Sequence, residues 1–150
     1  MNTIFVIGDP AAQGSKRMVR LKNGRTVLLE QSKKVKPWRE AVAVQAAKQK
    51  CPVYVGDVAM YAIVRFARPA NQFKANKELK ASAPARPGKL DCDKIARSIC
   101  DALTGIAYAD DRQVAVLAIQ RVWCNRGELP GATIFLSNAP AEGRVIFEHP

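Results

Sequence analysis

Apolar and polar positions follow two periods along the chain, one typical of strands and one typical of helices. A continuous apolar run at residues 3–7 ends at the Gly-Asp-Pro of 8–10, which is typical of a buried strand. Residues 54–66 are rich in Val, Tyr and Ile and predict a longer strand. Two further strands are predicted over residues 113–123 and 131–137, with a turn between them.

A hairpin and a first helix are predicted between the first two of these strands. Asn23-Gly24 is a strong signal for a two-residue turn, and strand-like residues 18–21 and 25–29 flank it. Pro37 suits the first turn of a helix, and the alanine-rich stretch from 38 to 50 holds no helix breaker. We therefore expect a hairpin followed by a helix.

The second predicted helix covers residues 92–103 and has two distinct faces. At about 100° per residue, Asp93, Arg97 and Asp101 lie within about 80° of arc on one face. The opposite face carries only apolar side chains, those of Ile95, Ile99, Ala102 and Leu103. One face is thus expected in the core, and the other presents an Asp-Arg-Asp row.

The order strands, helix, strand, helix, strands predicts an α+β fold. We expect a mixed β-sheet with two main helices on one side, in a single domain over residues 1–150. Residues 67–88 differ from the rest, because prolines interrupt them and large apolar side chains are few. They predict a mobile basic loop with one helical turn near residues 74–79, and loops of this length are usually functional or disordered.

The charge of the chain indicates a polyanionic partner. The 24 Lys and Arg residues outnumber the 13 Asp and Glu residues, which gives a net charge of +11. Nine basic residues fall within 16–39 and nine more within 65–97. Two segments of one sign cost self-repulsion, so nucleic acid is a better explanation than a merely solubilising surface. Binding to an anionic membrane is disfavoured, because no basic helix has an aromatic-rich apolar face.

Several classes of site are disfavoured by residue type and spacing. The four cysteines form no CxxC pair and the single histidine is His149, so neither a zinc site nor a histidine-dependent nucleophile is expected. We expect four buried, reduced thiols. Residues 8–16 have the wrong glycine spacing and the wrong Ser-Lys order for a phosphate-binding loop. No run approaches about 18 uncharged apolar residues and no signal peptide is evident, which predicts a cytosolic protein.

The acidic residues are concentrated in one segment. Five of the 13 fall between residues 91 and 111, namely Asp91, Asp93, Asp101, Asp110 and Asp111. Helix capping accounts for the first two but not for the last two. If the chain returns to the helix start, three carboxylates meet on a basic surface, where oxygen ligands select Mg²⁺ or Mn²⁺. The pattern leaves three alternatives: a metal-dependent nuclease, a non-catalytic nucleic-acid-binding module, or another Mg²⁺-phosphate enzyme.

The run at 90–114, LDCDKIARSICDALTGIAYADDRQV, resembles the RusA family of Holliday junction resolvases, small homodimeric endonucleases common in phages and prophages. The shared pattern is an Asp-x-Asp that opens a helix, a basic residue four positions on, an Asp-Ala-Leu helix end and an Asp-Asp before a strand. Looser similarity at residues 8–10, 68–69 and 82–84 extends the resemblance from residue 4 to about 138.

The resemblance implies an α+β homodimer and assigns its site. Asp91, Asp93 and Asp111 match the metal-binding catalytic aspartates, and Arg97 stands where the best-known members carry a lysine important for activity. Gln13 replaces another lysine of many members, which moves that contact to Lys16 or Arg17. The implied activity is Mg²⁺-dependent nicking of two opposed strands of a four-way junction, with Mn²⁺ as a substitute ion.

The candidate DNA contacts are the basic residues of both charged segments: Lys16, Arg17, Arg20, Lys74, Lys77, Lys80, Arg86, Lys89 and Lys94. The expected role is in DNA recombination and repair, in the cytoplasm of a bacterium or of a phage-infected host. A nuclease that acts on other branched DNA is the alternative substrate class.

Overall fold

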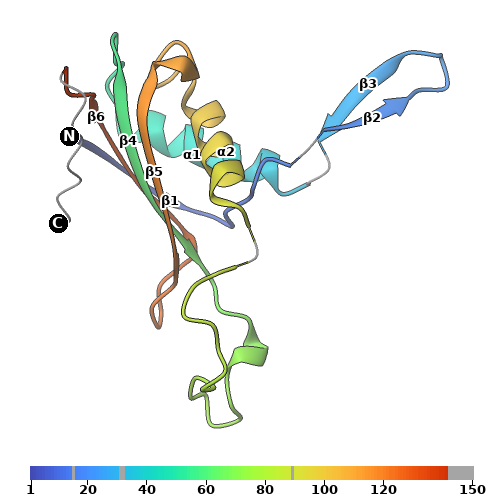
Figure 1. The fold of residues 1–150 in the computed structure, drawn as a ribbon, viewed down its shortest axis with the longest axis vertical. Helices are drawn as coiled ribbons and strands as arrows, with labels where there is room; N and C mark the ends of the chain where they lie inside the picture. Colours follow the sequence, from blue (N-terminus) through green and yellow to red (C-terminus); the bar gives the residue numbers. More distant parts are fainter. Residues whose placement is uncertain (15, 31–32, 89, 142–150) are drawn as a thin grey trace.

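The computed structural model describes residues 1–14, 16–30, 33–88 and 90–141. Lys89 and His149 lie outside the described residues, as do the side chains of Lys16 and Arg17. A four-stranded mixed sheet forms the body, in the order β1 (Asn2–Ile7), β6 (Gly131–Asn138), β4 (Val58–Phe66) and β5 (Val114–Trp123). The helices α1 (Val35–Lys48) and α2 (Cys92–Leu103) lie on one side of this sheet (Figure 1). The predicted α+β fold, with a mixed sheet and two helices, is confirmed.

The sheet contains both antiparallel and parallel strand pairs. β6 runs antiparallel to both β1 and β4, whereas β4 and β5 are parallel and are joined by the crossover that contains α2. Alternate residues of the two central strands face the helices, and the buried pairs are Met60 with Leu136, Ala62 with Ile134 and Val64 with Ala132. This period-two pattern fixes the register, since a slip of one residue would expose the whole set.

The helix α2 begins and ends where the sequence predicts. Ile95, Ile99 and Leu103 are fully buried, while Asp93 and Arg97 are exposed on the opposite face. The computed faces of this helix are therefore confirmed. The other side of the sheet bears Phe5, 60% exposed, and a stacked pair, Tyr61 and Phe135, with ring centroids 5.7 Å apart.

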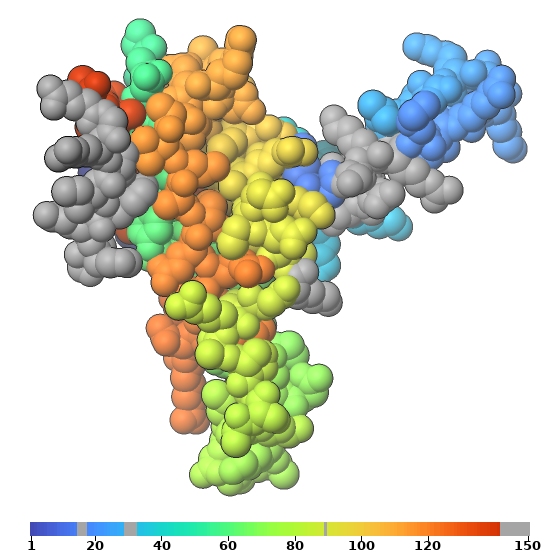
Figure 2. All heavy atoms as spheres, viewed as in Figure 1, coloured from blue at the N-terminus to red at the C-terminus, as the bar shows by residue number. Residues whose placement is uncertain are grey.

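The predicted hairpin is confirmed and projects from the body as an arm (Figures 1 and 2). Its strands are β2 (Lys16–Arg20) and β3 (Thr26–Glu30), paired antiparallel. The two-residue turn expected at Asn23-Gly24 is wrong, because the Leu21 amide donates to the carbonyl of Arg25 and three residues, 22–24, form the loop. Gly24 takes the left-handed conformation there, with a φ of +82°.

The boundary predicted at residue 54 is wrong for a reason of tertiary structure. The strand expected from residue 54 begins at Val58, because residues 54–57 bond to another segment. There the amide of Tyr54 donates to the carbonyl of Ala107, and the Gln113 side chain donates to the carbonyls of Tyr54 and Gly56.

The helical turn expected near residues 74–79 is also wrong. A 3₁₀ turn lies earlier, at Ala70–Gln72, and a β-bridge joins Phe73 to Leu79 around a left-handed Lys77. The loop is anchored to the end of β5, where Trp123 Nε1 donates to the carbonyl of Pro84 over 2.9 Å. Its mobility remains a prediction.

The four cysteines are free thiols, as expected, but only Cys100 is buried. Cys51, Cys92 and Cys124 are half-buried, because each lies at the end of an element, where neighbours cover the side chain on one side only. Among the described residues, no helix is long and apolar enough to cross a membrane.

Candidate active site

The start of α2 is held against the loop that follows β1. The buried Ser98 hydroxyl lies 2.8 Å from the carbonyl oxygen of Ala11, and the Gln13 amide donates to the carbonyl of Lys94 over 3.0 Å. These bonds join positions more than 80 residues apart and bring the loop at 8–14 alongside the first turns of the helix. They are what places Asp9 and Asp91 on one groove.

We expect Ser98→Ala to lower the free energy of unfolding by about 1–3 kcal/mol, because it removes the buried hydroxyl whose one proton is shared between the carbonyl oxygens of Ala11 and Ile95. Urea denaturation of the variant and of Ser82→Ala, an exposed serine in the 67–88 loop, measures the difference. Equal stabilities would show that this hydrogen bond does not hold the loop.

A groove of about 760 Å³ lies between the loop after β1, the 67–88 loop and the start of α2. Asp91 lines it as the N-cap residue of α2, yet its side chain makes no capping hydrogen bond. The carboxylate is 66% exposed and forms an ion pair with Lys94 over 3.0 Å. Helix capping therefore does not explain Asp91, and its carboxylate is available to a ligand in the groove.

Asp9 lines the same groove and was not singled out by the sequence analysis. Its carboxylate pairs with Lys34 over 2.7 Å, and this hydrogen bond is the main cause that raises the pKa of Lys34. No local pattern links two residues 25 positions apart, so only the folded structure reveals the pair. The groove thus alternates two carboxylates with two ammonium groups.

Asp93 and Arg97 lie on the solvent-facing side of α2. Among the described residues no carboxylate lies within ion-pair distance of Arg97, so it is free to meet a phosphate. Asp101, further along this face, pairs instead with Arg39 of α1 over 3.7 Å. No sequence pattern singles out Arg39, yet its ion pair with Asp101 links the two helices.

Asp110 and Asp111 lie near the other end of α2. Asp110 caps the 3₁₀ turn η2 (Asp111–Gln113), accepting from the Arg112 amide over 2.9 Å. Hydrogen bonds from Arg112 lower the pKa of Asp110 to about 2. Asp110 therefore has a structural role, while Asp111 is exposed.

The negative charge of Asp111 acts on two buried groups at the C-terminal half of α2, Cys100 and Tyr108. Burial raises the pKa of Cys100 to about 11, and Asp111 and Asp101 contribute to this rise. Burial likewise raises the pKa of Tyr108, whose hydroxyl donates to the carbonyl of Cys100 over 3.1 Å. Both groups therefore stay neutral at physiological pH.

The three predicted metal ligands do not meet within one chain. Asp91 and Asp93 belong to the first turn of α2 and Asp111 follows its last turn, and a twelve-residue helix is about 18 Å long. The described part of the chain contains no cluster of three or more acidic, histidine or cysteine side chains that could hold a metal ion. The return to the helix start that the sequence suggested is therefore not made. The assignment of the three aspartates remains a prediction.

The predicted DNA contacts fall on three surfaces. Lys94 lines the groove, Arg20 is exposed on the hairpin arm, and Lys74, Lys77, Lys80 and Arg86 are exposed on the 67–88 loop. Gln13 is buried, so its side chain cannot replace a lysine at a phosphate. The contact expected of Lys16 or Arg17 falls on side chains outside the described residues.

Comparison with known protein families matches residues 8–136 of the 150 to the family described as Endodeoxyribonuclease RusA. No curated protein matches the chain. The match covers most of the length, including the groove, both ends of α2 and the loop between β4 and α2. The chain belongs to the RusA family of endodeoxyribonucleases, enzymes that hydrolyse DNA at Holliday junctions.

Proposed function

We propose that this protein is a Mg²⁺-dependent Holliday junction resolvase that cuts two opposed strands as a homodimer. The observation that supports it best is the position of acidic residues at both ends of α2 in a chain of net charge +11. Carboxylates on such a surface oppose DNA binding unless a cation neutralises them. We further propose a role in recombination and repair, in the cytoplasm of a bacterium or phage-infected host.

We propose that the metal site is completed across the dimer. Asp91 and Asp93 of one subunit would supply two carboxylates, and Asp111 of the partner subunit the third. Oxygen ligands of this kind suit Mg²⁺, with Mn²⁺ as a substitute. When bound, the ion would activate water and stabilise the charge that develops on the scissile phosphate. Lys94 and Arg97 would hold the DNA backbone beside it.

The edge of β5 supports an assembly of this kind. β5 is an outer strand of ten residues, and among the described residues no strand pairs with its outer edge and no proline within it blocks pairing. Antiparallel pairing of two β5 edges about a two-fold axis would set the start of one strand beside the end of the other. Asp111 precedes the start of β5, and Arg121 near its end donates to the carbonyl of Leu90, next to Asp91. The two halves of the proposed metal site would then meet.

We expect the wild-type protein to sediment as a dimer without DNA and the double variant Ala115→Lys, Leu117→Lys as a 16.4 kDa monomer. Both side chains are exposed on β5, and lysines on an edge strand oppose edge-to-edge pairing. Phe5→Lys, on the uncovered face of the sheet, is the control. If Phe5→Lys is a monomer and the double variant is still a dimer, the interface is formed by the uncovered face of the sheet and not by the edge of β5. A wild-type monomer, both alone and on a junction, would contradict paired cutting.

Metal dependence separates the proposed nuclease from a binding module. We expect no product in EDTA and product from a four-way junction on addition of Mg²⁺ or Mn²⁺, because the carboxylates alone activate no water. A protein that binds with a steep salt dependence but cuts no branched substrate with either ion would contradict the proposed activity.

A further inference from the structure

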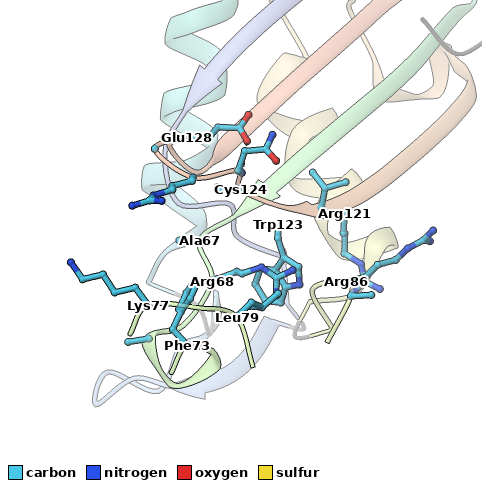
Figure 3. A pocket seen from close by; sticks show the side chains of 16 residues that line it. Ala67, Arg68, Phe73, Lys77, Leu79, Arg86, Arg121, Trp123, Cys124 and Glu128 are labelled. Atoms are coloured by element: carbon cyan, nitrogen blue, oxygen red, sulfur yellow. Dashed lines mark hydrogen bonds between the residues drawn. The ribbon is translucent and has the colours of Figure 1, made fainter. Parts of the chain in front are cut away.

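A second hollow lies next to the groove, between the 67–88 loop and the turn that joins β5 to β6 (Figures 2 and 3). Its volume is about 910 Å³, within the range of pockets that hold small organic groups. Ala67 and Trp123 line both hollows, so the second pocket opens beside the groove that contains Asp91. A DNA strand bound along the groove would then pass close to this pocket.

The pocket has flat walls, a guanidinium plane and aromatic rings, that are held in place. Arg68 lies over the Trp123 ring, with its Cζ 4.9 Å from the ring centroid. Hydrogen bonds to Gln72 and to the carbonyl of Pro84 fix the guanidinium plane. Phe73, 36% exposed, enters the wall from the loop (Figure 3). Guanidinium planes and aromatic rings are the side-chain surfaces on which unstacked bases rest.

The rim of the pocket is cationic. Lys77, Arg86 and Arg126 line it, and none of them is within ion-pair distance of a carboxylate in the described part of the chain. Glu128 also lines the pocket, but its carboxylate forms an ion pair with Arg65, with Nε and Oε1 3.1 Å apart. A pocket with planar walls and an uncompensated basic rim matches a nucleotide, which has an apolar flat base and an anionic backbone.

We propose that this pocket takes up one nucleobase turned out of the stack at a DNA branch point, an inference that rests on the proposed function. Bases in intact duplex are paired and stacked, and turning one out costs a few kcal/mol, whereas an unpaired base at a distortion costs less. Occupation of the pocket would thus favour branched over linear DNA. It would also set the distance between the recognised base and the phosphate in the groove.

The test is binding in EDTA, measured by fluorescence anisotropy, to a duplex with one bulged 2-aminopurine and to the intact duplex of the same sequence. We expect the wild-type protein to prefer the bulged duplex and to quench the 2-aminopurine by stacking. Phe73→Ala should reduce the affinity ratio at least about fivefold, from the loss of one stacking surface. Arg68→Lys keeps the positive charge but removes the planar guanidinium, and it should also reduce the affinity ratio. Val55→Ala, an apolar side chain 94% exposed outside the pocket, is the matched control.

The pocket assignment would be overturned if both variants kept the wild-type affinity ratio for bulged over intact duplex and the wild-type quenching of 2-aminopurine. If the wild-type protein nevertheless cuts a junction in Mg²⁺, that outcome rejects the role of the pocket but not the proposed nuclease function. Conversely, loss of the preference in Phe73→Ala, in a protein that cuts no branched DNA, supports the pocket and removes the nuclease.

Discussion

Asp91→Asn is expected to reduce junction cleavage by at least about a thousandfold while junction binding in EDTA stays equal or becomes tighter. The substitution removes one ligand charge of the proposed metal site. It also removes a carboxylate that repels phosphate when no cation is bound. Because the side chain is exposed and makes no capping bond, the fold should not change. Cleavage and gel-shift measurements on the same junction separate the two effects.

Asp57→Asn is the control for this prediction, because Asp57 is an exposed carboxylate outside the motif. It should cut at the wild-type rate. The same loss of cleavage is expected for Asp93→Asn and Asp111→Asn. An Asp91→Asn protein that is folded by circular dichroism and cuts normally would show that the metal site is elsewhere.

A mixture of two inactive variants is expected to regain activity. If Asp111 completes the site of the partner subunit, a heterodimer of Asp91→Asn with Asp111→Asn has one complete site and one doubly altered site. Random pairing of the two chains gives about half heterodimers, so about a quarter of wild-type sites are restored. These dimers should nick one strand of a junction and leave the opposed strand intact.

The matched control mixes Asp91→Asn with Asp93→Asn. Both substitutions affect the same half of the site, so no subunit combination restores a complete ligand set and the mixture should stay inactive. Subunit exchange is verified by labelling one variant with ¹⁵N, because the unlabelled variants have equal masses. Recovery of activity in neither mixture would then mean that each subunit holds its own ions. Recovery of cleavage in both mixtures would contradict the assignment of Asp91 and Asp93 to one half of the site and Asp111 to the other.

Local patterns predicted the elements whose residues interact along the chain. The α2 helix was predicted to the residue, because its apolar spacing, its acidic first turn and the Thr104-Gly105 stop all agree. The hairpin was likewise predicted from Asn23-Gly24, although its loop is one residue longer than the expected two-residue turn. The β4 boundary was missed, because Gln113 and Ala107, more than 50 residues away, take the hydrogen bonds of residues 54–57.

The site was predictable in its residue types but not in its arrangement. The acidic cluster and its match to the family could be read from consecutive residues. Whether Asp111 returns to Asp91 depends on the direction of the chain after α2, which the sequence pattern does not contain. The Asp9–Lys34 pair and the stacking of Arg68 on Trp123 are contacts between distant segments, and they became visible only in the folded chain.

The most direct test of the central claim compares cutting of a four-way junction with cutting of a linear duplex of the same sequence, in Mg²⁺ and in EDTA. We predict symmetric paired nicks in the junction with Mg²⁺, no cutting of the duplex, and no product in EDTA. Equal cutting of the duplex, or cutting confined to flaps and other branched substrates, would contradict the assignment as a Holliday junction resolvase.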